Sequence, residues 1–413
     1  MRILIAAANR GIVGGVETYL RVLIPALVAR GHQIALLFEN SCHDTAARVD
    51  PPDVPVWIWN SESPTESELE ELIRWGPDVA YYHSTKSVET GSALAALVPT
   101  ILYAHDYSGT CISGRKCHAF PRIEPCNRTF GPTCLALYYP RRCGGLNPLR
   151  ALSLYRWQAR RKAQLREFRM VLVASNHMRK ELQNNGAYPE KLEVLSLPNT
   201  QRIPGTAPPA PRTHKGRILF VGRLTDVKGT RVLIEAIRLA EAALNHPLKL
   251  EIAGEGSERA DLEQFAARTG VAAEFLGFLD SKAMHDVMGD ADLLGVPSLW
   301  PEPFGLVGIE AGSLGLPAVG FAVGGIEEWL IPGKSGEVAP GDPPAAQGLA
   351  DAIVRAFADP DHYNLLRRGA WDVSTQFTMD RHLDRLDDIW RLATAGVNED
   401  NFHAAQAGEH YSM

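Results

Sequence analysis

Short apolar runs alternate with helix-length amphipathic segments along this chain, and the alternation restarts after a proline-rich interval. Before that interval, apolar runs at residues 2–8, 33–38, 79–83, 100–105 and 171–174 predict buried strands. Such alternation is typical of an open parallel sheet covered by helices. Because 413 residues exceed what one hydrophobic core ordinarily supports, we expect two such α/β units.

The first unit is expected to span residues 1–198, with helices over residues 16–30 and 150–170. Apolar residues recur at helical spacing in the first of these helices, and Gly31 ends it. Residues 107–148 form a long cysteine-rich insert that we expect to be irregular. Long ordered loops in compact domains are often functional.

Five prolines between residues 198 and 211 mark a linker, which we place at residues 199–216. A second unit, residues 217–374, repeats the pattern, with expected strands at 217–222, 248–253, 273–276, 292–297 and 319–322 and expected helices at 229–244, 257–269 and 281–289. Residues 375–395 are expected to form a closing helix, and the polar segment 396–413 is expected to be disordered.

Composition excludes several classes of protein. With 45% hydrophobic and 22% charged residues and a net charge of −6, the chain is not a basic nucleic-acid binder. The apolar run at residues 3–8 is better interpreted as a strand than as a signal peptide. Residues 305–326 are apolar, but their glycines, Glu310 and Pro317 exclude a membrane span. We therefore expect a cytoplasmic protein.

Six cysteines raise the question of metal or redox chemistry. Cys42 stands apart, and five lie in the insert: Cys111, Cys117, Cys126, Cys134 and Cys143. In a cytoplasmic protein such a cluster favours metal or redox chemistry over structural disulfides. Gaps of five, eight, seven and eight residues are poor for zinc, which usually uses a closely spaced pair. Reduced thiols, a metal site and disulfides all remain open.

Two glutamates, Glu302 and Glu310, lie eight positions apart around the start of a predicted helix. A helix N-terminus suits a diphosphate, whereas nearby carboxylates must bond hydroxyl groups. The pair and the small residues after it resemble the Glu-x7-Glu signature of retaining glycosyltransferases of the two-Rossmann-domain (GT-B) type, family 4. The resemblance implies two Rossmann-like doubly wound domains facing a central cleft, with the closing helix crossing back onto the first. It also implies sugar transfer from a nucleotide sugar to a hydroxyl acceptor.

A glycine-bounded loop opens the second unit: residues 222–229 match the family pattern Gly-Arg-x4-Lys-Gly. Arg223 supplies a planar fork for phosphate oxygens and Lys228 a point charge. Two fixed cations would stabilise a departing diphosphate in place of a metal. By resemblance, Glu302 holds the donor sugar and Glu310 the ribose. The other expected donor-binding positions are Gly15, Gly222, Gly254, Phe278, Leu279, Phe304, Gly305 and Leu306.

His105 ends a strand of the first unit. The family places a histidine here against the donor sugar, so the resemblance adds His105 to Arg223, Lys228 and Glu302 as a catalytic residue. Asp106 and His83 are expected on the acceptor side. A rival dinucleotide-binding interpretation fails, because the glycines after the first strand do not form Gly-x-Gly-x-x-Gly.

No metal is expected in the cleft. Asp290-Ala291-Asp292 has the form of a metal motif, but Asp292 precedes a buried apolar run. Arg223 and Lys228 already supply the charge that a metal would bring. The nucleotide sugar is a substrate, so no cofactor is expected. The spacing of the insert cysteines argues against a metal there but does not exclude one.

The predicted helix over residues 150–170 carries seven basic residues and one acid, Glu167, with several apolar side chains. Such a helix either lies on an anionic membrane, as in relatives with lipid-linked acceptors, or is an ordinary solvated helix. The first interpretation adds peripheral contact with the inner membrane face. A phosphorylase or epimerase of the same fold, and a non-catalytic sugar-binding protein, remain as alternative functions.

Overall fold

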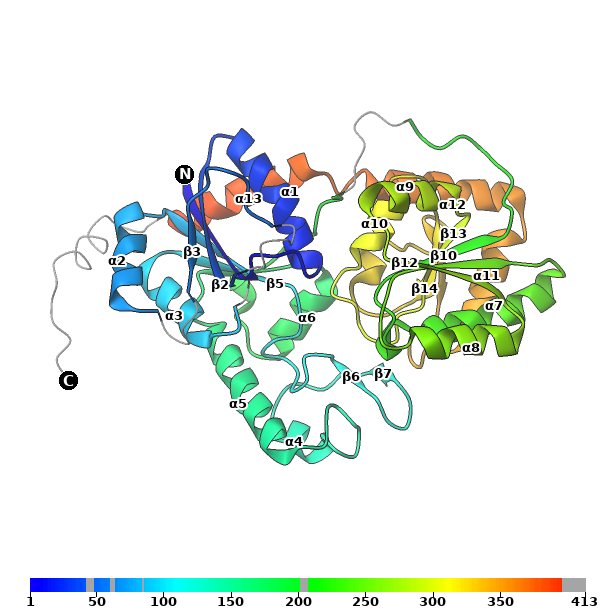
Figure 1. The fold of residues 1–413 in the computed structure, drawn as a ribbon, viewed down its shortest axis with the longest axis horizontal. Coiled ribbons are helices and arrows are strands. Elements are labelled where there is room, and N and C mark those ends of the chain that lie inside the picture. Colours follow the sequence, from blue (N-terminus) through cyan, green and yellow to red (C-terminus); the bar gives the residue numbers. More distant parts are fainter. Residues whose placement is uncertain (42–47, 60–63, 84, 201–206, 396–413) are drawn as a thin grey trace.

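The computed structural model describes residues 1–41, 48–59, 64–83, 85–200 and 207–395, and it contains two lobes, each built around a parallel sheet (Figure 1). The first sheet has seven strands in the order β3-β2-β1-β4-β5-β8-β9, and the second has six in the order β12-β11-β10-β13-β14-β15. Neighbouring strands are parallel throughout both sheets. The expected pair of Rossmann-like doubly wound domains is confirmed.

The first lobe alternates strands and helices, because parallel neighbours need a crossover of a dozen or more residues. Its strands are β1 (Arg2–Asn9), β2 (Gln33–Asn40), β3 (Val56–Ile58), β4 (Val79–Tyr82), β5 (Thr100–Ala104), β8 (Met170–Val173) and β9 (Leu192–Val194). Its helices are α1 (Gly15–Ala29), α2 (Glu66–Trp75), α3 (Val88–Leu97), α5 (Pro148–Gln164), α6 (Asn176–Asn184) and the 3-10 turn η1 (Pro189–Lys191). All five expected strands are present.

The second lobe follows the expected order closely. Its strands are β10 (Arg217–Val221), β11 (Lys249–Ala253), β12 (Ala272–Gly277), β13 (Leu293–Val296), β14 (Ala318–Phe321) and β15 (Gly336–Ala339). Its helices are α7 (Thr230–Leu244), α8 (Arg259–Thr269), α9 (Ser281–Asp290), α10 (Leu306–Gly312), α11 (Ala346–Phe357) and α12 (Pro360–Ser374), with 3-10 turns η2 (Asp226–Lys228) and η3 (Gly325–Glu328).

The last helix, α13 (Met379–Thr394), returns to the first lobe and packs against α1 and β4 (Figure 1). Its buried His382 fixes the contact, because Nε2 lies 2.7 Å from the Tyr19 hydroxyl and Nδ1 lies 2.9 Å from the Ser196 carbonyl oxygen. Arg30, the residue after α1, adds a surface ion pair to Asp384 at 2.7 Å. The expected crossover is confirmed. The segment 396–413 lies outside the described residues.

The cysteine-rich insert is more regular than expected. It contains the short hairpin β6 (Cys117–His118) and β7 (Glu124–Pro125) and the helix α4 (Thr133–Leu137). Buried Lys116 anchors it to α6, with Nζ 2.7 Å from a Glu181 carboxylate oxygen. The five insert cysteines are free thiols, and Cys42 lies outside the described residues.

The expected helix over residues 150–170 is wrong at its end. Helix α5 stops at Gln164, because Leu165 and Phe168 turn into the core and Met170 begins β8. Arg161, one of the five basic residues of α5, is buried, and its guanidinium donates to the Tyr82 hydroxyl at 3.0 Å. Among the described residues, no helix is both long and apolar enough to span a membrane.

Candidate active site

Loops that follow the carboxyl ends of both sheets meet between the lobes. The Tyr107 hydroxyl, after β5, donates to the Pro301 carbonyl oxygen at 2.7 Å. The Ser175 hydroxyl, after β8, donates to the Pro303 carbonyl oxygen at 2.7 Å. Strand order reverses at β1/β4 in one sheet and at β10/β13 in the other. Open α/β sheets bind ligands at such reversals, outside the carboxyl ends of the strands.

Lys228 and Glu302 are brought together at one reversal, because β10 and β13 are neighbours in the sheet. Lys228 Nζ lies 2.5 Å from Glu302 Oε1. The Ser298 hydroxyl and the Trp300 indole N–H donate to the same oxygen, at 2.8 and 3.0 Å. Glu302 is only 7% exposed, and its Oε2 has no partner among the described residues. The second oxygen is therefore free to accept a hydrogen bond from a ligand hydroxyl group.

The glycines of the second lobe let three loops approach one another. A Cβ on Gly229 (φ 72°) would lie 2.0 Å from the Pro297 carbonyl oxygen. A Cβ on Gly254 (φ 147°) would lie 2.0 Å from the Gly222 carbonyl oxygen. Both positions combine positive φ with close backbone contact, which only glycine tolerates. Gly222 and Gly254 therefore shape the loops around Lys228.

The remaining donor-side positions differ in what they can offer a ligand. The Arg223 side chain is exposed and has no partner among the described residues, and the Phe278 ring is 85% exposed. Leu279 packs against the core of the second lobe. Phe304 is buried against Phe377, with ring centroids 5.5 Å apart, so only its backbone can reach a ligand.

The loop before α10 leaves backbone donors unused. Gly305 (φ 85°) is the residue before the helix, and Leu306 is its first residue. In the described part of the chain, no acceptor bonds the N–H groups of Phe304, Gly305 or Leu306. The first N–H groups of a helix lack intrahelical partners. These three remain available to an anion or a sugar oxygen.

Glu310 sits in α10 beside the segment that joins the lobes. The Thr200 hydroxyl donates to its Oε1 at 2.6 Å. Burial raises the pKa of the Glu310 carboxyl group, while this hydrogen bond lowers it. The structure shows no direct contact between Glu310 and Lys228 or Glu302 within the described residues. The two glutamates therefore occupy different parts of the region between the lobes.

Two histidines end neighbouring strands of the first lobe. His83 follows β4, His105 follows β5, and His83 Nδ1 lies 2.8 Å from His105 Nε2. The His105 ring is partly exposed and stacks on Tyr103, with centroids 4.5 Å apart. His83 is only 3% exposed, so little of its side chain is open to a ligand. Burial lowers the pKa of His105 to about 3 and that of His83 well below its usual range, so both rings are neutral at pH 7.

Asp106 and Gly15 complete the first-lobe positions. The Asp106 side chain is exposed, and its Oδ1 accepts the Ser108 N–H at 2.8 Å, which stabilises the turn after β5. A Cβ on Gly15 would meet no atom within 4 Å. The fold itself therefore leaves open space beside Gly15, at the start of α1. Glu17 is occupied locally, since it accepts the Gly14 N–H at 2.9 Å.

Asp292 comes directly before β13, whereas Glu302 follows the carboxyl end of the same strand. Its Oδ2 accepts the backbone N–H groups of Lys215 and Arg217 at 2.7 and 3.0 Å, immediately before β13. The carboxylate is thus committed to holding the start of the sheet. Across the described ranges, no group of three or more His, Cys, Asp or Glu side chains is arranged to hold a metal ion.

Sequence reasoning missed four residues that shape the site. Ser298 and Trp300 orient Glu302, and the indole ring of Trp300 also lies 5.7 Å from Lys228 Nζ. Arg115 of the insert reaches the second lobe and pairs with Asp226 at 2.6 Å. Asp226 belongs to the same turn as Lys228. Trp300 lies between a predicted strand and Glu302, so its place in the site could have been predicted from the sequence. The pairing of Arg115 with Asp226 could not, because the two residues are 111 positions apart.

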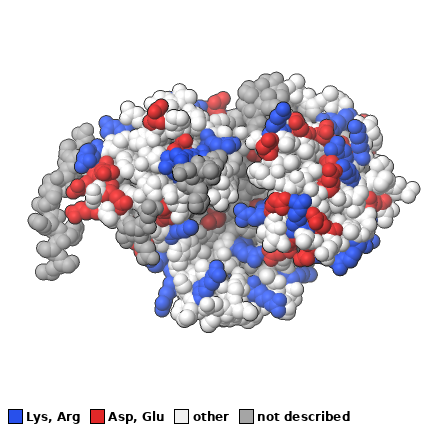
Figure 2. All heavy atoms as spheres, viewed as in Figure 1, with Lys and Arg blue, Asp and Glu red and all other residues white. Residues whose placement is uncertain are grey.

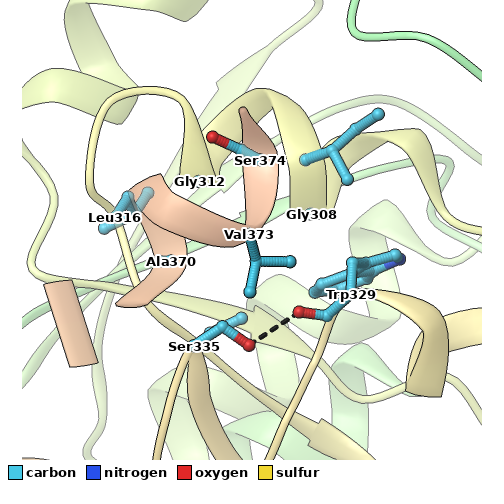
Figure 3. Close-up of a pocket in the computed structure, with 10 residues that line it drawn as sticks. Gly308, Gly312, Leu316, Trp329, Ser335, Ala370, Val373 and Ser374 are labelled. Carbon is cyan, nitrogen blue, oxygen red and sulfur yellow. Dashed lines mark hydrogen bonds between the residues drawn. The ribbon is translucent and has the colours of Figure 1, made fainter. Parts of the chain in front are cut away.

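A small pocket behind α10 lies apart from these groups (Figure 3). Its lining residues include Gly308, Gly312, Leu316, Trp329, Ser335, Ala370, Val373 and Ser374. The Ser335 hydroxyl donates to the Trp329 carbonyl oxygen at 2.6 Å. A Cβ on Gly308 would lie 2.2 Å from the Trp329 ring, so α10 packs tightly against Trp329 beside this pocket. None of the expected site residues lines it.

Comparison with known proteins covers both lobes. Residues 13–198 match the family model described as Glycosyltransferase Family 4, and residues 207–371 match Glycosyl transferases group 1. A glycogen synthase of Mycobacterium tuberculosis is 38% identical over 154 residues, which are 36% of each chain. A D-inositol 3-phosphate glycosyltransferase of Corynebacterium urealyticum is 31% identical over 180 residues, 42% of each chain. The matches thus span less than half the length of these curated relatives.

Solved structures match over nearly the whole chain. HepE of Anabaena, in complex with UDP and glucose, has a TM-score of 0.66 at 19% identity, covering 94% of this chain and 99% of that chain. Sucrose-phosphate synthase of Thermosynechococcus elongatus has a TM-score of 0.67 at 19% identity, covering 95% and 99%. At this identity the likeness establishes a shared fold.

Proposed function

Because this chain belongs to the GT-B glycosyltransferases of family 4, we propose that it transfers a sugar from a nucleotide sugar to a hydroxyl acceptor with retention of configuration. The observation that carries the proposal is the ion pair of Lys228 and Glu302 between the lobes. It supplies a cation for a diphosphate and, in Oε2 of Glu302, an acceptor for a sugar hydroxyl group.

The proposed chemistry is a displacement on one face of the sugar. As the bond between the anomeric carbon and the phosphate oxygen breaks, negative charge grows on the diphosphate, and Lys228 and Arg223 stabilise it. The leaving phosphate oxygen takes the proton of the acceptor hydroxyl as the new glycosidic bond forms. His105 is neutral and contributes a hydrogen bond to the donor sugar, without acting as a base.

Other donor contacts follow from the positions of the remaining residues. Glu310 would bind the ribose hydroxyl groups, and the backbone N–H groups around Gly305 would face the diphosphate or the sugar. Open space beside Gly15 supports an approach of the donor from the first lobe. Gly222, Gly254, Phe278 and Leu279 are proposed to border the nucleotide, and Asp106 the acceptor.

UDP-glucose is the first donor to test, since HepE was solved with it and shares the fold. Thermal unfolding should be recorded with UDP-glucose and with GDP-, ADP- and dTDP-sugars. A donor at about 100 times its Kd stabilises the native state by about 2.7 kcal/mol. Lys228→Ala should reduce the shift, and Lys282→Ala, which replaces an exposed lysine of α9, should keep it. No shift with any donor would contradict the proposal.

Product analysis separates this proposal from its alternatives. Donor consumption that requires an added hydroxyl acceptor supports transfer, whereas consumption with phosphate alone, or without any acceptor, indicates a phosphorylase or an epimerase. Donor binding without turnover under any condition indicates a sugar-binding protein. Transfer should persist in EDTA, and a strict requirement for Mg²⁺ would contradict stabilisation by Arg223 and Lys228.

A lipid-linked acceptor is supported by the surface of α4 and α5. Residues 125–166 contain no Asp or Glu and nine Lys or Arg, all of them except Arg161 at least partly exposed, although the chain has a net charge of −6. Figure 2 shows basic and no acidic side chains on the visible face of this protruding part of the first lobe. Leu146 and Leu149, next to exposed Arg150, are 84% and 78% exposed. This surface is proposed to contact an anionic membrane.

A further inference from the structure

His83 is only 3% exposed, and it bonds a residue of the proposed site, His105. Its ring is buried among Tyr19, Tyr81 and Tyr103, with centroid distances of 5.9, 4.3 and 6.0 Å. Its one hydrogen bond among the described residues joins Nδ1 to His105 Nε2 at 2.8 Å. His105 Nδ1 has no partner in the described part of the chain and belongs to a partly exposed ring.

The shared bond contains a single proton, because both rings are neutral. Either His83 Nδ1 donates to His105 Nε2, or the reverse holds. The buried Nε2 of His83 decides between them, since it has no hydrogen-bond partner among the described residues. If Nε2 carried the proton of His83, an N–H group would be buried without an acceptor, and such orphaned donors are rare in folded proteins. The favoured tautomer of His83 therefore carries its proton on Nδ1.

This tautomer determines the state of His105. Once Nε2 accepts from His83, the one proton of neutral His105 must lie on Nδ1, the nitrogen without a protein partner. An isolated neutral histidine prefers its proton on Nε2, so the pair reverses the ordinary preference. His105 would then present an N–H donor to its open side, where the oxygen of a sugar hydroxyl group would accept it.

We propose that His83 is a positioning residue that fixes His105 as the Nδ1–H tautomer, so that His105 offers a hydrogen-bond donor to the donor sugar. The second part rests on the proposed function, whereas the tautomer is a property of the protein alone. The two histidines thus have different roles. His105 contacts the sugar, and His83 acts only through His105.

Nitrogen-15 NMR of the imidazole rings tests the tautomer without any ligand. Protonated and unprotonated ring nitrogens resonate far apart, and His105→Gln assigns the His105 signals by removing them. We expect a protonated Nδ1 and an unprotonated Nε2 for His105 at pH 7. The opposite pattern in the wild-type protein would overturn the proposal, whatever the outcome of donor-binding experiments.

Two variants test whether His83 is the cause. In His83→Asn, a side-chain amide N–H replaces Nδ1–H, so His105 should keep its tautomer. In His83→Leu no donor remains, so His105 should shift to the Nε2–H form. His246→Asn, an exposed control, should leave the His105 signals unchanged. An unchanged His105 tautomer in a folded His83→Leu protein would overturn the proposal; if that variant does not fold, the wild-type and His83→Asn spectra decide it.

Donor binding separates the tautomer from its proposed use. With UDP-glucose as the probe, the thermal shift should be kept in His83→Asn and reduced in His83→Leu. A normal shift in His83→Leu, with the NMR result as expected, would overturn only the use of His105 as a donor to the sugar. Absence of a shift in the wild-type protein is instead a failure of the proposed function for this donor.

Discussion

Glu302 and Lys228 form an ion pair between two neighbouring strand ends, with Nζ 2.5 Å from Oε1. The carboxylate is nearly buried, whereas the Lys228 side chain is partly exposed, and Ser298 and Trp300 donate to the same Oε1. Glu302 therefore fixes the direction of the Lys228 side chain. Since an ammonium group carries three N–H donors, Lys228 can keep this bond and still donate to a phosphate oxygen.

Replacing Lys228 should lower kcat strongly and leave the protein folded. Lys228→Ala should lower kcat by about 100-fold or more, as expected when a group that stabilises transition-state charge is removed. Lys228→Arg keeps the charge and should retain more activity than Lys228→Ala. Steady-state kinetics with the donor found by thermal shift, together with circular dichroism, checks both points. Equal turnover in wild type and Lys228→Ala would refute the role of Lys228 at the leaving group.

Membrane contact should depend on the exposed residues at the start of α5, including Leu149 and Arg150. Leu149→Ser/Arg150→Ser removes one exposed apolar side chain and one charge, and each basic residue near an anionic surface contributes about 1 kcal/mol. Cosedimentation with vesicles containing phosphatidylserine should show binding weakened by about tenfold or more. Leu365→Ser/Arg238→Ser, a matched pair of exposed residues on the second lobe, should bind as the wild type does. Equal binding by both variants would contradict the proposed surface.

The second lobe was the more predictable from sequence, and the reason is physical. Each of its expected strands is a short apolar run bounded by glycine or polar residues, and all five appear within a few residues of their predicted bounds. In the first lobe, β3 and β9 have three residues each, so β3 (Val-Trp-Ile) is too short a run to mark a strand, and Glu193 interrupts the apolar residues of β9. The expected end of α5 failed because Leu165 and Phe168 continue a helical pattern after the backbone has turned.

Within the candidate site, local motifs were predictable and contacts between distant segments were not. The Lys228 loop and the Glu302 loop both follow strands, so their convergence could be inferred from strand order. The burial of His83 could not, because it depends on Tyr19, Tyr81 and Tyr103 packing around the ring. The need for glycine at position 254 arises from backbone contact with Gly222, which the sequence does not reveal.

We expect the ionised Glu310 side chain to lower the stability of the fold and to strengthen nucleotide binding. Burial raises its pKa, so the folded state binds the proton more tightly than the unfolded state, and the ionised carboxylate costs stability above the folded pKa. Glu310→Gln removes this cost and still accepts the Thr200 hydroxyl, so Tm at pH 7 should rise, on the order of 1–3 °C. Nucleotide binding should weaken by about 10- to 100-fold, as for a lost hydrogen bond to a charged group.

Calorimetry and nucleotide titration check both effects for Glu310→Gln. Glu235→Gln, on the exposed face of α7, is the control and should change neither Tm nor affinity. A Glu310→Gln protein that binds UDP-glucose as tightly as the wild type would exclude Glu310 from the ribose contact. A lower Tm would show that the ionised carboxylate stabilises the fold.

His382 should make the attachment of α13 sensitive to acid. Burial lowers its pKa from 6.5 to about 4, and both ring nitrogens are already used, with Nδ1–H donated to the Ser196 carbonyl oxygen and Nε2 accepting from Tyr19. The unfolded state therefore binds the proton more readily. Stability is fully present above pH 6.5 and is lost as the pH falls toward 4, by at most about 1.4 kcal/mol per pH unit for this residue.

Urea unfolding at several pH values between 4.5 and 7.5 measures this slope. His83 and His105 have lowered pKa values as well and add to it, so the wild-type slope belongs to several residues. His382→Asn removes the titrating ring, while its amide can still donate to Ser196. The variant should be less stable than the wild type at pH 7.5 and should lose less stability on acidification. A slope identical to that of the wild type, with His246→Asn as the exposed control, would show that His382 titrates normally in the folded protein.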